Sequence, residues 1–256
     1  MSDRVAIVTG ASQGIGRATA IRLARDFDAI TLVARNRANL EQTATDVKAA
    51  GAACVVIDVD LAAPEAAQRV VDDTLAAFGR IDSLLNIAGA VPQIDVFEMT
   101  DAQWEQGLAL KLHGARRLTI AAWPSLKASA GSVVLMSGNS ALFPKAPYAA
   151  VGTINAAIVA LAKAFSDRGI ADGVQVNSVL PGPVMTGRRR SYLEHWAPLH
   201  GMSVDEATAR FPVEAGIARY GTPEEIAELI AFVVSPAAHW MTGSALRMDG
   251  GEVKSV

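Results

Sequence analysis

Cysteine is almost missing from this sequence, and neither sign of charge is in marked excess. The one cysteine, Cys54, has no partner for a disulfide within the chain, which suits a reducing cytoplasm. The 23 basic and 26 acidic residues leave a net charge of −3. That balance argues against a nucleic-acid-binding protein, which usually carries a basic excess. No group of His, Cys, Asp and Glu has metal-site spacing, so we expect no bound metal.

Long hydrophobic runs are also lacking. No apolar stretch approaches the ~18 residues of a membrane-spanning helix. The start of the chain, Met1 to Arg4, leads into an apolar run shorter than the ~7–15 residues of a signal peptide. We therefore expect a cytoplasmic protein without a membrane partner. Aliphatic residues are abundant instead, because 51% of the 256 residues are hydrophobic and only 5% are aromatic.

Short β-branched runs alternate with longer segments of helical periodicity. The predicted strands are 5–9, 30–34, 53–58, 83–86, 132–137, 174–179 and 245–248, and the predicted helices are 14–26, 39–50, 64–78, 101–129, 148–168 and 223–235. Apolar strands that alternate with helices indicate a parallel sheet covered on both faces. We therefore predict a single α/β domain over residues 1–256, with a doubly wound sheet of seven strands.

A glycine-rich turn separates the first predicted strand from the first predicted helix. It reads Thr9-Gly10-Ala11-Ser12-Gln13-Gly14-Ile15-Gly16. Glycines let the backbone approach a pyrophosphate, and the helix N-terminus offers amide donors and a partial positive charge. A turn of this kind between a strand and a helix predicts a dinucleotide site.

Other segments match a known pattern in order along nearly the whole chain. They are Asp58-Val59, Asn86-Ile87-Ala88-Gly89 and Pro181-Gly182-Pro183-Val184-Met185-Thr186. Together with the T-G-x-x-x-G-x-G turn, they resemble the short-chain dehydrogenase/reductase family. The resemblance implies a Rossmann-type domain with strand order 3-2-1-4-5-6-7, a homotetramer, and hydride transfer between a nicotinamide cofactor and a carbonyl or secondary alcohol. The cofactor-binding residues it implies are Gly10, Ser12, Gln13, Gly14, Ile15, Gly16, Arg35, Asp58, Val59, Asn86, Ala88, Gly89, Pro181, Gly182, Val184 and Thr186.

The end of the second strand favours one of the two nicotinamide cofactors. A cofactor with a free ribose 2′-hydroxyl usually meets an acid there, but the sequence has Ala34 followed by Arg35. A guanidinium grips a phosphate with two hydrogen bonds. We therefore predict NADP(H), with NAD(H) as the alternative. Gln13 stands against this choice, because NADP-preferring relatives often carry a basic residue at that place.

The family's catalytic set is incomplete in this sequence. By resemblance, a tyrosine is the acid/base, a lysine four residues later lowers its pKa, and a serine about a dozen residues before the tyrosine polarises the carbonyl. Tyr148 matches the tyrosine, but Gly152 stands in the lysine place. The serine place falls in the fifth strand, which indicates a shortened connection. Ser140 is the first candidate for it and Ser137 the second.

A lysine stands where the family has an asparagine. Lys111 occupies that place, on a helix that resembles the family's W…N-L-x-G segment. In the family this asparagine lies near the lysine through a bound water. We therefore hypothesise that Lys111 replaces the missing lysine; the alternative is an unrelated substitution at the edge of the core. Asn155, seven residues after Tyr148, is a further candidate for the site.

The segment 187–216 breaks the alternation of strands and helices. A long excursion after the carboxyl end of a strand is where a substrate lid is expected, and 202–210 is typical of a short helix. The predicted substrate-binding residues are Asn139, Arg188, Arg189 and Trp196. The arginine run at 188–190 favours an anionic substrate, with a solvated surface as the alternative.

These patterns predict an NAD(P)-dependent oxidoreductase that acts on a small carbonyl or alcohol. The incomplete catalytic set leaves two alternatives open. One is a nucleotide-binding protein without redox activity. The other is a lyase or isomerase on the same fold. We expect no nucleic-acid partner.

Overall fold

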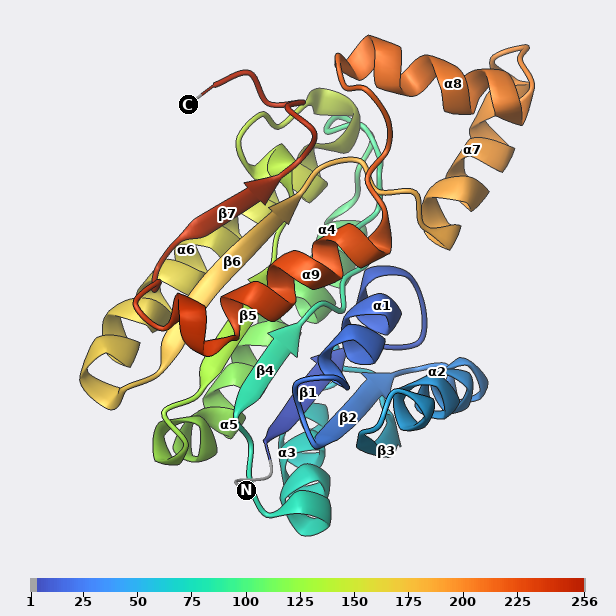
Figure 1. Cartoon of the computed structure of the whole chain (residues 1–256). Coiled ribbons are helices and arrows are strands. Elements are labelled where there is room, and N and C mark those ends of the chain that lie inside the picture. The colour runs from blue at the N-terminus through green and yellow to red at the C-terminus, as the bar shows by residue number, and fades with distance from the viewer. Residues whose placement is uncertain (1–3, 256) are drawn as a thin grey trace.

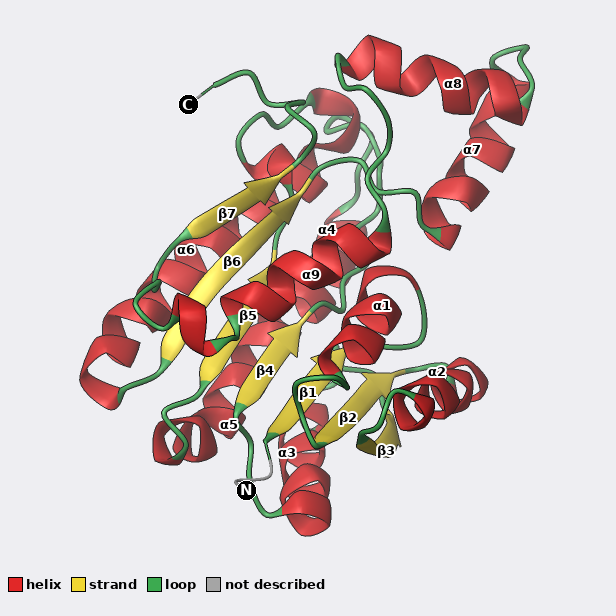
Figure 2. Cartoon of the chain, viewed as in Figure 1, coloured by secondary structure: helices red, strands yellow, loops and turns green. Residues whose placement is uncertain are grey.

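The computed structural model describes residues 4–255 and is built on one parallel sheet (Figures 1 and 2). The strand order is β3-β2-β1-β4-β5-β6-β7, which confirms the predicted fold class and topology. The strands are β1 (Val5–Thr9), β2 (Ala29–Ala34), β3 (Ala53–Asp58), β4 (Ser83–Asn86), β5 (Ser132–Met136), β6 (Gln175–Pro181) and β7 (Ala245–Met248).

Helices cover both faces of the sheet. Those around it are α1 (Gly14–Leu23), α2 (Arg37–Ala49), α3 (Ala66–Phe78), α4 (Asp101–Gly107), α5 (Ala115–Ala128), α6 (Ala149–Asp172) and α9 (Pro223–Val233). Buried side chains of α1, α2 and α9 form one core layer, and those of α3, α5 and α6 form the layer on the opposite face. Short 3-10 turns lie at η2 (Asn139–Ala141), η3 (Ala146–Tyr148) and η4 (Pro236–Ala238).

The predicted helix 101–129 is not a single α-helix. A π-helical segment, η1 (Leu108–Gly114), separates α4 from α5. Glycines stand at the two ends of this irregular stretch. A Cβ on Gly107 would lie 2.9 Å from Ile154 Cδ1, and one on Gly114 would lie 2.8 Å from the Leu61 carbonyl oxygen. Close packing against neighbouring elements therefore holds the π segment in place.

The central crevice opens where the chain reverses direction across the sheet, between β1 and β4. Thr9, the last residue of β1, is fully buried there. Its hydroxyl accepts hydrogen bonds from the amides of Ile87 and Ala88, and it donates one to the Leu85 carbonyl. This side chain ties the ends of the two strands together at the place where open α/β sheets bind ligands.

The segment 187–216 forms two helices that stand away from the body of the sheet (Figure 1). They are α7 (Gly187–Leu199) and α8 (Val204–Ala215). The predicted short helix at 202–210 is corrected to α8, which begins after Ser203 because this serine and Glu206 form a capping box. Leu193, Ala197, Ala207 and Tyr220 form a separate small core between the two helices.

One helix is long and apolar enough to span a membrane by length and composition, and it runs from Ala146 to Asp172. This corrects the expectation that no segment approaches that length. In the structure α6 packs against β5, β6 and η2, and its Ile154, Ile158 and Ala162 are buried. The apolar side chains on the face of α6 that meets the sheet therefore belong to the core of the domain.

Candidate active site

A cavity of about 900 Å³ opens at the carboxyl ends of β1 and β4. The glycine turn forms its floor, and the glycines are required by contact. A Cβ on Gly16 would lie 2.2 Å from the Gly10 carbonyl oxygen, and one on Gly10 would lie 3.1 Å from the Ala88 backbone. Gly14 has a φ of +54°, which disfavours other residues. The turn therefore presents its backbone to the cavity at the N-terminus of α1.

Most of the predicted cofactor-binding residues line this cavity. They are Gly10, Ser12, Gln13, Gly14, Ile15, Gly16, Arg35, Val59, Ala88, Gly89 and Thr186. The sequence reasoning did not assign to the cofactor several other residues of the lining, such as Asn36, Asp60, Leu110, Met136 and Arg188. These lie just beyond the motifs, where only the fold brings them to the crevice.

Five of the predicted cofactor-binding residues do not line the cavity. Asp58 forms an ion pair with Arg37 at 3.0 Å, and Asn86 is buried with its amide nitrogen on the Thr119 hydroxyl. Val184 packs on a core cluster. Pro181 and Gly182 face a second cavity instead.

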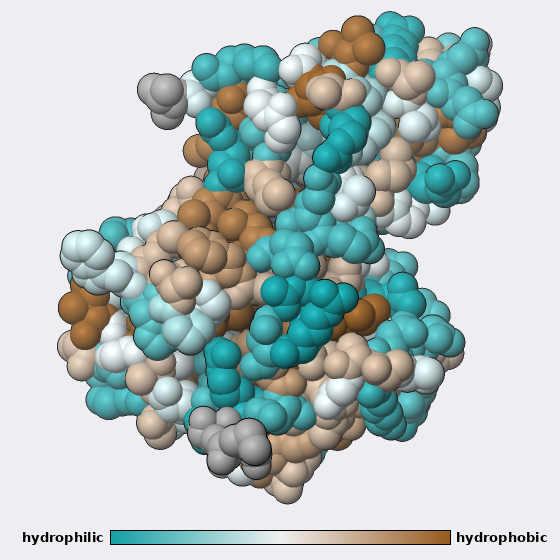
Figure 3. Space-filling view, viewed as in Figure 1, coloured by the Kyte–Doolittle hydropathy of each residue, from teal (hydrophilic) through white to brown (hydrophobic). Residues whose placement is uncertain are grey.

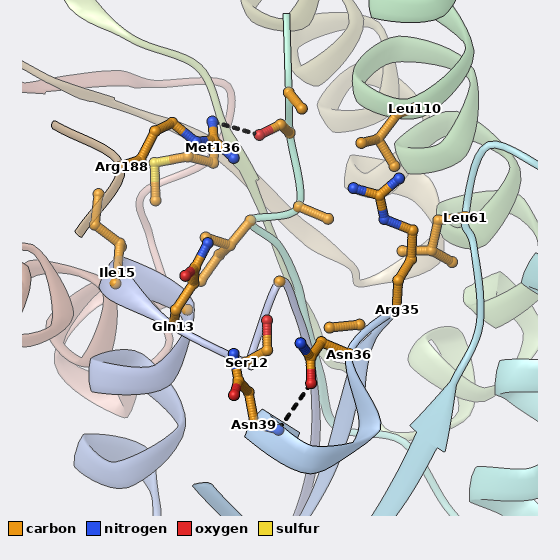
Figure 4. A pocket seen from close by; sticks show the side chains of 18 of the residues that line it. Ser12, Gln13, Ile15, Arg35, Asn36, Asn39, Leu61, Leu110, Met136 and Arg188 are labelled. Atoms are coloured by element: carbon orange, nitrogen blue, oxygen red, sulfur yellow. Dashed lines mark hydrogen bonds between the residues drawn. The ribbon is translucent and has the colours of Figure 1, made fainter. Parts of the chain in front are cut away.

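The cations around the first cavity have different environments (Figure 4). Arg35 is mostly exposed, and its nearest carboxylate oxygen, on Asp60, is 3.9 Å away. Arg37 is already paired with Asp58 and Glu41. Arg188 donates a hydrogen bond to the Gly89 carbonyl. Loss of hydration lowers the pKa of Arg188, and the positive charge of Arg35 adds to the shift. An anion between Arg35 and Arg188 would relieve this repulsion.

A second cavity, of about 460 Å³, lies beneath α7 and α8. The predicted residues in its lining are Asn139, Ser140, Tyr148, Arg189 and Trp196. Further lining comes from Gly138, Phe143, Val151, Asn155, Tyr192, Phe211, Glu214 and Glu252, among others.

A chain of hydrogen bonds joins the two cavities. Lys111, which lines the first cavity, donates from Nζ to Asn155 Oδ1 at 2.5 Å and to the Ser137 carbonyl at 3.3 Å. Asn155 then donates from Nδ2 to Ser140 Oγ at 2.8 Å, and both residues line the second cavity. Loss of hydration lowers the pKa of Lys111 from 10.5 to about 8, and Arg188 adds to the shift.

The comparisons with known proteins cover nearly the whole chain. A family model described as enoyl-(acyl carrier protein) reductase matches residues 10–252. The chain belongs to the short-chain dehydrogenase/reductase family. It is 30% identical to the short-chain reductase protein NovJ of Streptomyces niveus over 249 residues, which are 97% of this chain and 94% of that protein.

Two solved structures show how similar the fold is. L-sorbose reductase from Gluconobacter frateurii, in complex with NADPH and L-sorbose, has a TM-score of 0.95 at 29% identity, with 100% of this chain and 98% of that chain covered. A variant of actinorhodin polyketide ketoreductase with NADPH has a TM-score of 0.93 at 27% identity, with 99% and 98% covered. As a short-chain dehydrogenase/reductase, the chain is a hydride-transfer oxidoreductase that uses a nicotinamide cofactor.

Position 152 in this short-chain dehydrogenase/reductase has no room for a lysine. Gly152 is buried, and a Cβ on it would lie 2.6 Å from Pro144 Cβ and 3.0 Å from the Ser140 carbonyl oxygen. The α6 residue that meets Lys111 is Asn155, one turn further along. Ser137 donates its hydroxyl hydrogen to the Asn155 carbonyl, so that hydrogen is already engaged.

The three arginines at 188–190 have different surroundings. Arg188 faces the first cavity and Arg189 the second, whereas Arg190 is exposed and lines neither. Successive residues of a helix point about 100° apart, so a run of three cannot face one ligand. Arg188 therefore lies in the lining of the first cavity, and substrate binding by this residue stays a prediction.

Proposed function

We propose that this short-chain dehydrogenase/reductase uses NADP(H) to interconvert a carbonyl and a secondary alcohol. The observation that carries the proposal is the pair of cavities, one at the glycine turn and one beneath α7 and α8, joined through Lys111 and Asn155. When bound, the cofactor would supply or accept a hydride.

The first cavity fits a dinucleotide by the chemistry of its lining. Gly10 and Gly16 let the turn pack closely at the start of α1, since a Cβ on Gly16 would meet the Gly10 carbonyl and one on Gly10 would meet the Ala88 backbone after β4. A helix N-terminus of this kind suits a phosphate. Arg188 has no carboxylate partner among residues 4–255, and Arg35 has an exposed ion pair with Asp60 at 3.9 Å, so both guanidinium groups suit the phosphates of the cofactor. NADPH in the sorbose reductase and ketoreductase structures supports NADP(H) here.

The catalytic groups that we propose line one or the other of the two cavities. Ser140 and Tyr148 line the substrate side, and Lys111 lines the cofactor side. A carbonyl in the second cavity would receive polar contacts from Ser140, and both the Tyr148 phenol and the Lys111 ammonium carry a transferable proton. Ser137 lines neither cavity, and its hydroxyl donates a hydrogen bond to the Asn155 carbonyl.

We propose a substrate with an anionic group, held by Arg189. Its guanidinium lies over the rings of Phe211, Tyr192 and Tyr220 at 4.1, 5.1 and 5.6 Å. Its Nε is buried and has no hydrogen-bond partner among residues 4–255, and neither has the buried Tyr220 hydroxyl. A carboxylate or phosphate oxygen supplies what Nε lacks. Asn139 and Trp196 contribute other parts of the wall.

We propose a homotetramer located in the cytoplasm. On the face shown in Figure 3, apolar side chains gather over β7 beside α9. Phe232 at the end of α9 and Met248 at the end of β7 are 46% and 37% exposed. The exposed Ala156, Ala160 and Ala164 follow one another at every fourth residue of α6 and allow a second helix to approach closely. Light scattering on the purified chain tests the assembly.

Hydride transfer is tested by absorbance at the nicotinamide band in single-turnover experiments. We expect NADPH to be consumed with small keto acids, and the variant Gly14→Val to abolish both binding and turnover, because Gly14 has φ +54° at the phosphate site. A protein that binds NADPH but oxidises none of it with any carbonyl would refute the proposed activity.

A further inference from the structure

Lys111 stands at the centre of η1, the π-helical segment of the described residues. A π segment inserted between α-helices is uncommon, and it is found frequently at functional sites. Gly107 and Gly114 allow this one to pack against Ile154 and the Leu61 backbone. The irregular backbone of η1 thus places the Lys111 side chain in the lining of the first cavity.

The ammonium group of Lys111 is held by neutral acceptors. Nζ donates to Asn155 Oδ1 and to the Ser137 carbonyl, and no carboxylate within residues 4–255 pairs with it. An ammonium has three N–H donors, so one is left for a ligand in the cavity that Lys111 lines. Asn155 is itself fixed by its second hydrogen bond, to Ser140.

Tyr148 is outside this network. It precedes the first residue of α6, and its hydroxyl has no hydrogen-bond partner among residues 4–255. Because Asn155 is the α6 residue that meets Lys111, it occupies the place of the family's lysine, and the tyrosine place four residues earlier is then Val151. About a dozen residues before Val151 lies the loop after β5, so the connection is not shortened. A Cβ on Gly138, in that loop, would lie 2.6 Å from Asn155 Nδ2.

We propose that Lys111 is the general acid and base of this enzyme, with Asn155 and Ser140 as positioning residues, in place of a tyrosine. The inference rests on the proposed function. In the reductive direction the carbonyl carbon gains a hydride from the reduced nicotinamide, and the π electron pair moves to oxygen. That oxygen takes a proton from Nζ to give the alcohol. The neutral amine then regains a proton from water in the open cavity. Oxidation runs through the same steps in reverse.

The electrostatic setting of Lys111 suits this role near neutral pH. The charged and titratable groups around the network are Arg188 from α7, Tyr148 before α6 and Glu252, which accepts a hydrogen bond from Asn139. Dehydration and the charge of Arg188 both disfavour the ammonium, so the pKa of Lys111 falls to about 8. An acid of this strength is protonated at pH 7 and releases its proton readily.

The first experiment compares variants by single-turnover reduction. Lys111→Met should slow hydride transfer at least 100-fold, because general acid catalysis contributes about 10²–10⁴-fold. Tyr148→Phe should lose at least tenfold less, and Lys48→Met, an exposed lysine on α2, serves as the control for loss of a lysine. A Tyr148→Phe loss that equals or exceeds that of Lys111→Met would overturn the assignment.

The second experiment follows the pH profile. In the parent, kcat/KM for reduction should fall tenfold per pH unit above about 8, the pKa of Lys111. Asn155→Asp places a carboxylate against Nζ and should move this limb to higher pH, because an opposite charge favours the ammonium. A limb that stays in place would mean that Asn155 does not position the acid.

The third experiment does not depend on turnover. NMR titration of lysine side chains in the cofactor-free protein should show one midpoint near 8, absent in Lys111→Arg. A Lys111 midpoint near the ordinary value of about 10.4 would refute the inference. Failure of the parent to oxidise NADPH would instead refute the proposed function, so the two outcomes are distinguishable.

Discussion

Gly152 packs against the loop that follows β5, and this contact explains why position 152 carries no side chain. In an α-helix interior, alanine normally stabilises by about 0.5–1 kcal/mol over glycine. Here the added carbon would meet Pro144 at 2.6 Å and the Ser140 carbonyl oxygen at 3.0 Å. Overpacking of a buried site costs about 1–3 kcal/mol, so the clash outweighs the gain in propensity.

Gly152→Ala should therefore lower the free energy of unfolding by about 1–2 kcal/mol. Urea denaturation measures this, with the slope m unchanged. Gly187→Ala is the matched control, because Gly187 begins α7 and nothing lies within 4 Å of its added carbon. A stability of Gly152→Ala at or above that of the parent would show that Pro144 moves away freely, and the steric account of position 152 would fall.

The residues of the site show where sequence reasoning reached its limit. The glycine turn, Arg35 and Lys111 were predicted from motifs, and each lines the crevice. The sequence offers Asn155 only as a candidate, because sequence spacing does not show that it contacts Lys111. The two residues lie on different helical segments, α6 and η1. Its contact with Lys111 depends on the π register of η1.

At the scale of elements, the predicted segments agree well with the observed ones, and the differences have tertiary causes. β6 extends two residues beyond its predicted end because Leu180 and Pro181 pair with β7, a partner more than 60 residues away in the sequence. The π segment is not visible in the sequence, since seven residues are too few to separate its period from that of an α-helix. The start of α8 also differs from the predicted 202, because Ser203 and Glu206 form a capping box and the helix begins at Val204.

The start of helix α7 contributes residues to both cavities. Thr186 lines the first cavity and caps α7 by accepting a hydrogen bond from the Arg189 amide. Arg189 then reaches the second cavity from the first turn of the helix. The predicted cofactor contact at Thr186 and the proposed substrate contact at Arg189 therefore lie at the same turn of α7.

Arg189→Gln should raise KM for an acidic substrate at least tenfold and leave KM for a neutral analogue within about twofold, since a charge-assisted hydrogen bond contributes about 1.5–3 kcal/mol. Arg190→Gln is the control, because Arg190 is exposed and lines neither cavity. Steady-state kinetics on the two substrates gives the ratio. Equal changes with both substrates would assign Arg189 to packing of the lid alone.

At the scale of the whole molecule, the sheet order and the layers followed from the alternation of strands and helices together with the family resemblance. The choice of cofactor remains the most direct test of the site as a unit. A ligand that binds only the folded state stabilises it by about 2.7 kcal/mol at 100 times its Kd. For a chain of this size that corresponds to a rise in Tm of about 5–10 °C.

NADPH should raise the Tm more than NADH at equal concentration, because Arg35 has its nearest carboxylate oxygen only at 3.9 Å and is available for the 2′-phosphate. Arg35→Ala should remove a contact of about 1.5–3 kcal/mol, so the affinity for NADPH falls about 10–150-fold. The shift with NADH should stay as in the parent.

Arg37→Ala is the matched control, since Arg37 is paired with Asp58 and Glu41. Thermal unfolding followed by circular dichroism gives the shifts of the three proteins with each of the two cofactors. Equal shifts with both cofactors in the parent, or an NADPH shift unaffected by Arg35→Ala, would contradict the assignment of the 2′-phosphate to Arg35.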